Sequence, residues 1–177
     1  MNIILEGMDL CGKSTLCKQI RELCNNPIEI HSSGPVKSAD NPWMYEFMYY
    51  MQLANMSVSY NQASDFIFDR FHLGVSVYGT KYRNYTDIEV ATLFQSVEKR
   101  LEDIETHLIV LIDNGSEIVK REDGLSHEKS AAEYDETKSR FISAYKASNV
   151  KHKTLINIST IGGFKNLYPL VKSFIGK

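Results

Sequence analysis

A glycine-rich turn directly after a short apolar run is the feature of this sequence that most constrains its fold. The run Asn2 to Leu5 is followed by Gly7-Met-Asp-Leu-Cys-Gly-Lys-Ser14, which has Walker A spacing, and then by an apolar helical pattern. In such a strand, loop and helix unit, the glycines let the backbone curl around phosphate, and the helix N-terminus supplies positive potential. The motif therefore predicts a phosphate-binding loop at the edge of an α/β sheet.

The residue types within this loop predict its ligands. We expect Lys13 to be an exposed lysine that reaches the β- and γ-phosphates of ATP, and the Ser14 hydroxyl to bind the Mg²⁺ that bridges them. The expected cofactors are therefore ATP and Mg²⁺. The residues expected to bind them are Gly7, Asp9, Leu10, Cys11, Gly12, Lys13, Ser14 and Thr15.

Five short apolar runs alternate with longer stretches of helical character over residues 1–177. This alternation predicts one domain with an α/β fold, a three-layer sandwich whose five-stranded parallel sheet is flanked by helices. The expected helices span residues 13–24, 42–62, 86–105, 131–149 and 163–175. The second of these is apolar and aromatic over more than one face, so it is expected to be buried or to line a pocket. The expected strands are Asn2 to Leu5, Pro27 to His31, Asp65 to Phe68, Leu108 to Ile112 and Thr154 to Ile158.

Charge and hydropathy narrow the class of protein. A net charge of -2 gives no overall basic field, which disfavours non-specific binding to nucleic acid. No apolar run approaches membrane-spanning length, and the first residues lack the pattern of a signal peptide. We therefore expect a cytoplasmic protein without a membrane partner.

Cysteine and histidine positions give no sign of a metal site. The cysteines are odd in number and lack zinc-like pairing, so they are expected to be reduced, small and partly buried: Cys11, Cys17 and Cys24. Four of the histidines are scattered, with no metal-ligand spacing: His31, His107, His127 and His152.

Two motifs together resemble the thymidylate kinase family. Glu6-Gly-Met-Asp9 before Gly12-Lys-Ser-Thr15 is similar to the opening of these kinases. Asp69-Arg70-Phe71, with Tyr78 following, is similar to their Asp-Arg-Tyr segment and later Ala-Tyr. A looser likeness to their lid and the helix after it runs from Arg121 to Arg140. The resemblance covers the whole chain at varying quality, and no guanine-reading Asn-Lys-x-Asp motif is present.

The resemblance implies roles for particular side chains. Asp69 would organise Mg²⁺, Arg70 would hold the acceptor phosphate with its planar fork, and Asp9 would accept from the sugar 3′-hydroxyl. Some family members carry an arginine where this loop has Leu10, so the lid, about residues 120–131, is expected to supply the missing cation. The candidates are Lys120, Arg121 and Lys129, and Arg121 is favoured. The expected catalytic residues are thus Lys13, Asp69, Arg70 and Arg121.

The acceptor side, about residues 31–62, departs from the family pattern. Lys37 could touch phosphate but cannot give bidentate recognition, and Ala54-Asn-Met56 stands where the family has Ala-Asn-Arg. Aromatic residues of the second helix could stack on a base or belong to the core, and His72 could line the site or serve packing. The expected acceptor-binding residues are Asp9, Lys37, Tyr49, Arg70, His72 and Tyr78.

These features favour ATP-dependent phosphorylation of a nucleoside monophosphate, a deoxypyrimidine one such as dTMP. The resemblance also implies that the chain could form a homodimer. The alternative enzyme acts on a nucleoside, or on a modified base or end of nucleic acid. A different class of protein, a nucleotide-dependent switch or ATPase, would use the same loop without a small acceptor.

Overall fold

The centre of the fold is a five-stranded parallel sheet in the order β2-β3-β1-β4-β5. The computed structural model describes residues 1–32, 41–124 and 126–176. The five strands lie where the sequence predicts them, with ends shifted by one or two residues. They are β1 Asn2–Gly7, β2 Ile28–His31, β3 Phe66–Asp69, β4 Thr106–Ile112 and β5 His152–Asn157.

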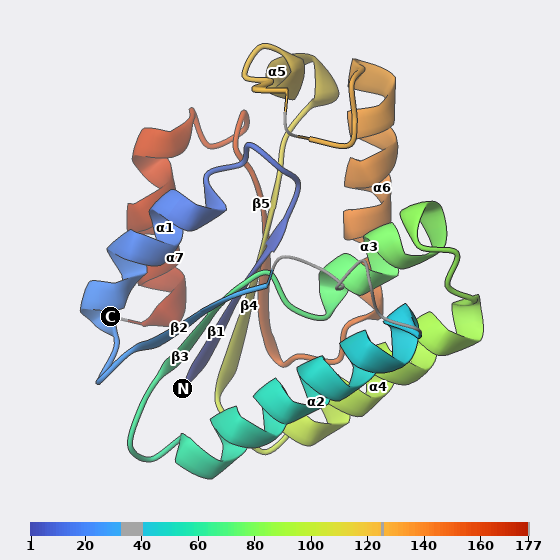
Figure 1. Cartoon of the computed structure of the whole chain (residues 1–177). Coiled ribbons are helices and arrows are strands. Elements are labelled where there is room, and N and C mark those ends of the chain that lie inside the picture. The colour runs from blue at the N-terminus through green and yellow to red at the C-terminus, as the bar shows by residue number, and fades with distance from the viewer. Residues whose placement is uncertain (33–40, 125, 177) are drawn as a thin grey trace.

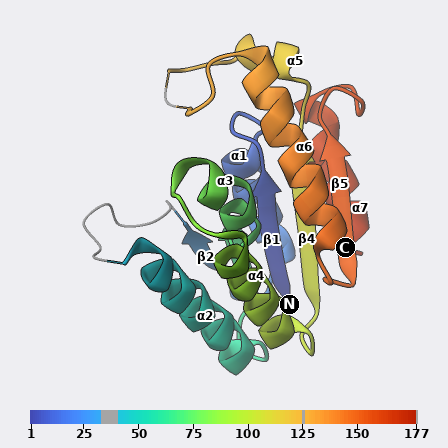
Figure 2. The same ribbon diagram turned by 90° about the vertical axis from the view of Figure 1, so that its right-hand side faces the viewer.

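Helices cover both faces of this sheet, which confirms the predicted three-layer α/β sandwich. Figures 1 and 2 show two helices on one side, α1 Lys13–Ile20 and α7 Leu167–Ile175. The opposite side carries α2 Pro42–Tyr60, α3 Leu73–Tyr82, α4 Asp87–Leu101 and α6 Ala131–Ala147. A short helix, α5 Gly115–Val119, lies beyond the carboxyl end of β4. Short 3-10 turns follow α1 and precede α7, at Arg21–Leu23 and Phe164–Asn166.

The central strands form the core because every one of their residues is buried. This holds for β1, β3 and β4, whose sequences are near-continuous apolar runs, as strands covered on both faces require. The edge strands β2 and β5 are partly exposed. At the start of α4, Thr86 and Glu89 form a capping box, in which each side chain bonds the other residue's backbone amide.

Helix α3 is absent from the sequence-based prediction, and its composition explains why. It contains Gly74, Gly79 and the β-branched Val75 and Val77, all poor helix formers. The buried Glu6 carboxylate at the end of β1 accepts hydrogen bonds from the amides of Phe71, at 2.8 Å, and Gly74, at 3.1 Å. A tertiary contact therefore satisfies the helix start that local propensity would not form.

Helix α2 is less buried than its composition suggested. Its buried stripe is narrow, consisting of Glu46, Tyr50, Ala54 and Ser57. Partly buried apolar side chains such as Phe47 and Met51 also pack against the core, whereas Met48 remains half-exposed. No helix within the described residues is long and apolar enough to cross a membrane.

The topology fixes where a ligand can bind. From β1 the chain passes through α1 to β2 on one side, whereas β4 follows β3 on the other side of β1. In open α/β sheets, ligands bind at the carboxyl ends of strands where the order reverses in this way. The glycine-rich loop lies at that point.

Candidate functional site

The loop between β1 and α1 has the backbone geometry of an anion cradle. Gly7, Leu10 and Gly12 have positive φ values of 127°, 60° and 80°. A Cβ on Gly7 would lie 1.9 Å from the carbonyl oxygen of Leu111 on β4, so only glycine fits there. The curl of the loop is therefore fixed by contact with the neighbouring strand.

Lys13 lies under this loop rather than exposed on it, which corrects the sequence-based expectation. Its side chain is only 4% exposed. The ammonium donates to the carbonyl oxygens of Gly7, at 3.0 Å, and Met8, at 2.7 Å. Burial, together with the nearby charge of Arg70, lowers the pKa of Lys13. The cation is thus held inside the loop by these two carbonyl oxygens.

Ser14 and Asp69, the expected Mg²⁺ ligands, are in contact although 55 residues separate them in sequence. The Ser14 hydroxyl donates to Oδ2 of Asp69 at 2.8 Å. The same Oδ2 lies 3.1 Å from Nδ1 of His31, and Oδ1 of Asp69 is buried without a hydrogen-bond partner among the described residues. Hydroxyl and carboxylate oxygens suit Mg²⁺, and an unpartnered buried oxygen is costly unless a cation or water meets it. These residues therefore fit the ion.

Arg70 is paired with Asp9, not with the adjacent Asp69. Its backbone is left-handed, with φ of 71°, which turns the side chain from β3 towards the loop. Nη2 of Arg70 lies 2.5 Å from Oδ1 of Asp9, and this same oxygen is 4.0 Å from Nζ of Lys13. One carboxylate oxygen of the loop therefore lies against both cations.

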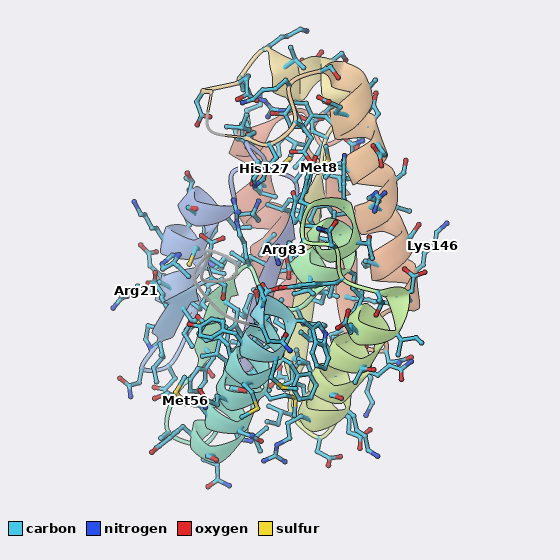
Figure 3. The ribbon with its side chains drawn as sticks, turned by 45° about the vertical axis from the view of Figure 1, so that its right-hand side comes forward. Met8, Arg21, Met56, Arg83, His127 and Lys146 are labelled. Atoms are coloured by element: carbon cyan, nitrogen blue, oxygen red, sulfur yellow. The ribbon has the colours of Figure 1, made fainter. Side chains whose placement is uncertain are left out.

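A cavity of about 100 Å³ lies on the Arg70 side of the loop. Of the expected acceptor-binding residues, Asp9, Arg70 and Tyr78 line it. Gly7 of the predicted loop lines it too, and Tyr50 is one of the α2 aromatic residues that could stack on a base, whereas most of the other lining residues were missed as site residues by sequence analysis. The missed residues include Glu6, Tyr82, Arg83 and His127. Figure 3 labels Arg83 and His127, which approach this region from below and above.

Three expected acceptor residues are not placed in this cavity. His72 is fully buried and its Nε2 lies 3.1 Å from Oε1 of Glu98, so it serves packing. Tyr49 stacks on Tyr45 with ring centroids 6.4 Å apart and does not line the cavity. Lys37 lies outside the described residues.

The missed residues carry no local signal because each gains its position from a partner on another element. Nη1 of Arg83, at the end of α3, donates to both carboxylate oxygens of Glu46 on α2, at 2.7 and 2.9 Å. His127 of the lid stacks on Tyr82 of α3 with centroids 5.0 Å apart. The lid segment therefore rests on α3 over the acceptor side.

The lid cations are paired with groups outside the phosphate loop. Arg121 donates to Oδ2 of Asp113 at 2.5 Å and to the carbonyl oxygen of Glu117 at 3.2 Å. Its guanidinium lies over the ring of Phe164, 5.1 Å from the centroid. Of the other two lid cations, Lys120 pairs with Glu117 of α5, and Lys129 lies near Glu122 of the lid. A contact of Arg121 with the phosphates remains a prediction.

Arg121 and Phe164 instead line a second cavity beside the loop, of about 480 Å³. A Cβ on Gly12 would lie 2.9 Å from the Phe164 ring, so this cavity borders the start of α1. Asn114 and Ser159, from the ends of β4 and β5, contribute polar groups to its wall. A flat group extending from a phosphate in the loop could enter it.

No family model matches the sequence, and none of the curated proteins matches it. Among solved structures, YorR of Bacillus subtilis in complex with phosphorylated GDP is similar, with a TM-score of 0.74 and 20% identity. That match covers 99% of this chain and 96% of that one. The thymidylate kinase of Candida albicans gives a TM-score of 0.60 and 12% identity over 99% of this chain and 90% of that one. The thymidylate kinase of Ehrlichia chaffeensis gives a TM-score of 0.55 and 17% identity over 89% of this chain and 87% of that one.

The chain has a thymidylate kinase-like P-loop fold. The predicted resemblance is confirmed at this level, because the matches span nearly the whole of both chains. In this thymidylate kinase-like fold, the loop, Asp69 and Arg70 meet at the carboxyl edge of the sheet. Two larger cavities, of about 930 and 720 Å³, lie away from that edge and contain no residue of the loop.

Proposed function

We propose that this chain is an ATP- and Mg²⁺-dependent kinase that phosphorylates a nucleoside monophosphate. The observation that supports this most strongly is the shared carboxylate of Asp9. Its Oδ1 lies against both the buried Lys13 of the loop and the Arg70 fork at the end of β3. Two phosphates that replaced this carboxylate would lie side by side, which phosphoryl transfer between them requires.

On the donor side, the loop would hold the phosphates of ATP. Backbone amides from Asp9 to Ser14, at the start of α1, would supply donors, and Lys13 would exchange its two carbonyl partners for phosphate oxygens. Bound Mg²⁺ would neutralise charge on the phosphates, held by Ser14 and through Asp69. The base would extend into the 480 Å³ cavity, where Arg121 and Phe164 offer flat faces.

On the acceptor side, Arg70 would exchange Asp9 for the acceptor phosphate. The fork of a guanidinium can donate two parallel bonds to phosphate, which a lysine cannot. Asp9 would then be free to accept from a sugar hydroxyl, as the family resemblance implies. In the reaction, an acceptor phosphate oxygen bonds to the γ-phosphorus while the bond to the β–γ bridging oxygen breaks.

The acceptor cavity must widen to take a nucleotide. Its volume of about 100 Å³ is below the roughly 300 Å³ at which ligand pockets begin. The contacts across it, Arg70 with Asp9 and His127 with Tyr82, are exposed enough to open. Aromatic side chains such as Tyr50 and Tyr82 would then be available to stack on a base.

We propose a deoxypyrimidine monophosphate such as dTMP as acceptor, since two of the similar structures are thymidylate kinases. A guanine nucleotide is the second candidate, because the YorR structure contains phosphorylated GDP. The Arg83–Glu46 pair beside the cavity is the polar group from α2 and α3 best placed to discriminate between bases.

A radiometric screen with γ-labelled ATP and Mg²⁺ tests the proposal. It would offer deoxynucleoside and ribonucleoside monophosphates of all bases, the matching nucleosides, and single- and double-stranded oligonucleotides. We expect label in a nucleoside diphosphate product. Label in a nucleoside or oligonucleotide would favour the alternative kinase, and release of inorganic phosphate without any acceptor dependence would favour a switch or ATPase.

A further inference from the structure

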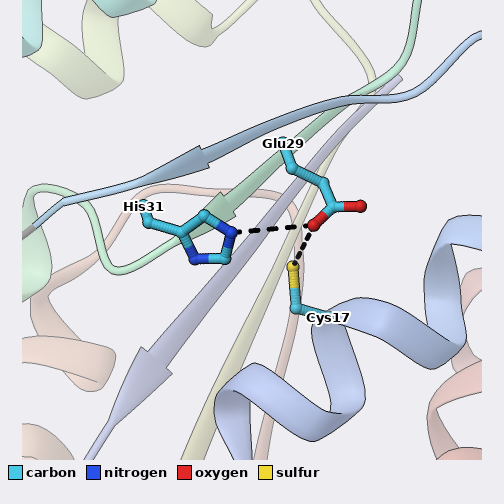
Figure 4. A group of neighbouring side chains, drawn as sticks. All are labelled: Cys17, Glu29 and His31. Carbon is cyan, nitrogen blue, oxygen red and sulfur yellow. Dashed lines mark hydrogen bonds and ion pairs between the residues drawn. The ribbon is translucent and has the colours of Figure 1, made fainter.

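Three side chains of metal-ligating type meet between α1 and β2, on the outer side of the proposed Mg²⁺ ligands. Cys17 projects from α1, and Glu29 and His31 are two residues apart on β2, so both face α1 (Figure 4). Sγ of Cys17 lies 3.6 Å from Oε2 of Glu29, and Nε2 of His31 lies 3.6 Å from the same oxygen. All three ligand atoms lie within 4.8 Å of one another.

These separations match a tetrahedral transition-metal site. Zinc bonds of about 2.3 Å to sulfur and about 2.0 Å to oxygen or nitrogen place two ligand atoms roughly 3.3 to 3.5 Å apart. The two measured separations of 3.6 Å are within a few tenths of an ångström of these values. His31 can supply the remaining movement that brings the ligand atoms together, because its side chain is 58% exposed and can rotate.

The hydrogen bond on the other nitrogen of His31 orients a lone pair into this space. Nδ1 lies 3.1 Å from Oδ2 of Asp69, and a carboxylate can only accept, so Nδ1 carries the proton. In a neutral imidazole, Nε2 then presents a lone pair to the carboxylate of Glu29. Two lone pairs that face each other repel unless a proton or a metal ion lies between them.

We propose that Cys17, Glu29 and His31 bind a divalent transition metal with affinity for thiolate, represented by Zn²⁺. The ligand set of sulfur, oxygen and nitrogen suits zinc, and water would complete the fourth position. Asp69 holds the histidine as carboxylates commonly do behind metal-bound imidazoles. Arg21 bonds the other oxygen of Glu29, at 2.7 Å, and leaves Oε2 directed at the site.

Metal binding at this site must displace one proton. Burial, with the nearby Glu29 carboxylate, raises the pKa of the Cys17 thiol to about 12, so the thiol is protonated at neutral pH. Binding forms the sulfur–metal bond and breaks the S–H bond, and the proton goes to solvent. No electron is transferred.

The site is linked to the proposed Mg²⁺ ligands through one carboxylate. Oδ2 of Asp69 accepts from Ser14 and from His31. A metal on Nε2 strengthens the Nδ1–H as a donor, which draws negative charge from Asp69 and weakens it as a Mg²⁺ ligand. This consequence rests on the proposed function, whereas the metal binding does not.

Titration of the purified chain with Co²⁺, a spectroscopic substitute for zinc, tests the site without any enzyme assay. We expect one equivalent to bind, with intense tetrahedral visible bands and a thiolate-to-cobalt charge-transfer band, and one equivalent of Zn²⁺ to abolish both. Cys17→Ser should remove the charge-transfer band. Glu29→Gln and His31→Gln, on the partly exposed β2, should weaken binding by more than tenfold.

The matched controls are Cys24→Ser, which changes another cysteine shortly after α1, and His152→Gln on the edge strand β5. Both variants should bind Co²⁺ as the unaltered chain does. The same charge-transfer band in Cys17→Ser, or no band in the unaltered chain, would overturn the proposal and indicate that a proton occupies the space.

A second measurement addresses the link to Asp69. Stoichiometric Zn²⁺ should raise the Mg²⁺ concentration needed for half-maximal phosphotransfer, and Cys17→Ser should remove this effect. Cobalt binding without any phosphotransfer would refute the proposed function but not the metal site. Phosphotransfer that zinc leaves unchanged, in a chain that binds cobalt, would refute the link.

Discussion

The proposed donor loop and the proposed acceptor cavity lie on either side of Asp9 but are built differently. The donor loop is one continuous segment, residues 7–15, and its curl depends on glycine where β4 comes close. The acceptor cavity is assembled from β1, β3, α2, α3 and the lid, and its walls are pairs between separate elements, such as Arg83 with Glu46. The donor side is therefore a local motif, whereas the acceptor side is a product of packing.

This difference explains why phosphate chemistry is easier to infer than the acceptor. A backbone cradle is nearly independent of the side chains around it, so its spacing in sequence identifies it. Selection of an acceptor depends on side chains, and these side chains and their neighbours differ among proteins that share a fold. Mutations on the two sides should therefore separate donor binding, acceptor use and stability.

The largest effect is expected for Lys13→Ala. Loss of the loop cation should lower the phosphotransfer rate by about 100-fold or more, because in the proposed reaction this charge stabilises the transition state. Steady-state rates and circular dichroism would be measured together, since Lys13 also bonds two loop carbonyls. The control is Lys18→Ala, an exposed lysine on the same helix. Retention of more than a tenth of the activity in a folded variant would argue against the loop assignment.

Arg70→Lys should act on the acceptor side alone. A point charge replaces a fork, so kcat/KM for the acceptor should fall by about 10- to 100-fold while ATP affinity changes less than about threefold. Kinetics with varied acceptor and calorimetric titration of ATP would separate the two. Arg100→Lys, exposed on α4, serves as the control. Equal losses for both substrates would show that Arg70 instead holds the loop through Asp9.

Arg121→Ala tests which part of the donor site the lid serves. Because Asp113 and the Glu117 carbonyl hold Arg121 beside Phe164, we expect the KM for ATP to rise by roughly tenfold with kcat nearly unchanged. Lys146→Ala, an exposed lysine on α6, is the control. A fall in kcat without a change in ATP affinity would instead support movement of Arg121 onto the phosphates, as the lid resemblance implies.

The smallest effect concerns Glu6, the carboxylate by which β1 supports the start of α3. Burial raises the pKa of Glu6 above its ordinary value of 4.5, so the folded chain binds this proton more tightly than the unfolded chain does. The stability from this group is full below that ordinary value and is lost as pH rises through the folded-state pKa. In Glu6→Gln, the side chain has no titrating proton but keeps an oxygen that can accept from the amides of Phe71 and Gly74.

We therefore expect Glu6→Gln to gain in relative stability as pH rises through that window. Urea midpoints of the two proteins, measured from pH 4 upwards, would give the difference. Glu22→Gln, an exposed residue, should show no such trend. A constant difference between Glu6→Gln and the unaltered chain would mean that Glu6 is not linked to folding by its proton.

Several expectations from sequence failed where a tertiary partner outweighs local preference. The glycines and valines of α3 disfavour a helix, but Glu6 stabilises its start by accepting from the amides of Phe71, just before the helix, and Gly74, in its first turn. His72 looks like a site residue beside Asp69 and Arg70, but Glu98 of α4 holds it in the core. His31 has no metal-ligand spacing in the sequence, and its proximity to Glu29 and Cys17 arises only from β2 pairing and α1 packing.

The sequence by itself determined the parallel sheet, the phosphate loop and the contribution of Ser14, Asp69 and Arg70 to one edge. These follow from short-range spacing and hydrophobic pattern, because parallel strands must end together and a glycine loop must curl. Only the tertiary structure decided that Lys13 is buried, that Arg70 pairs with Asp9, and that Arg121 rests on Phe164. Each of these depends on contacts between segments far apart in the chain, which no local pattern of residues records.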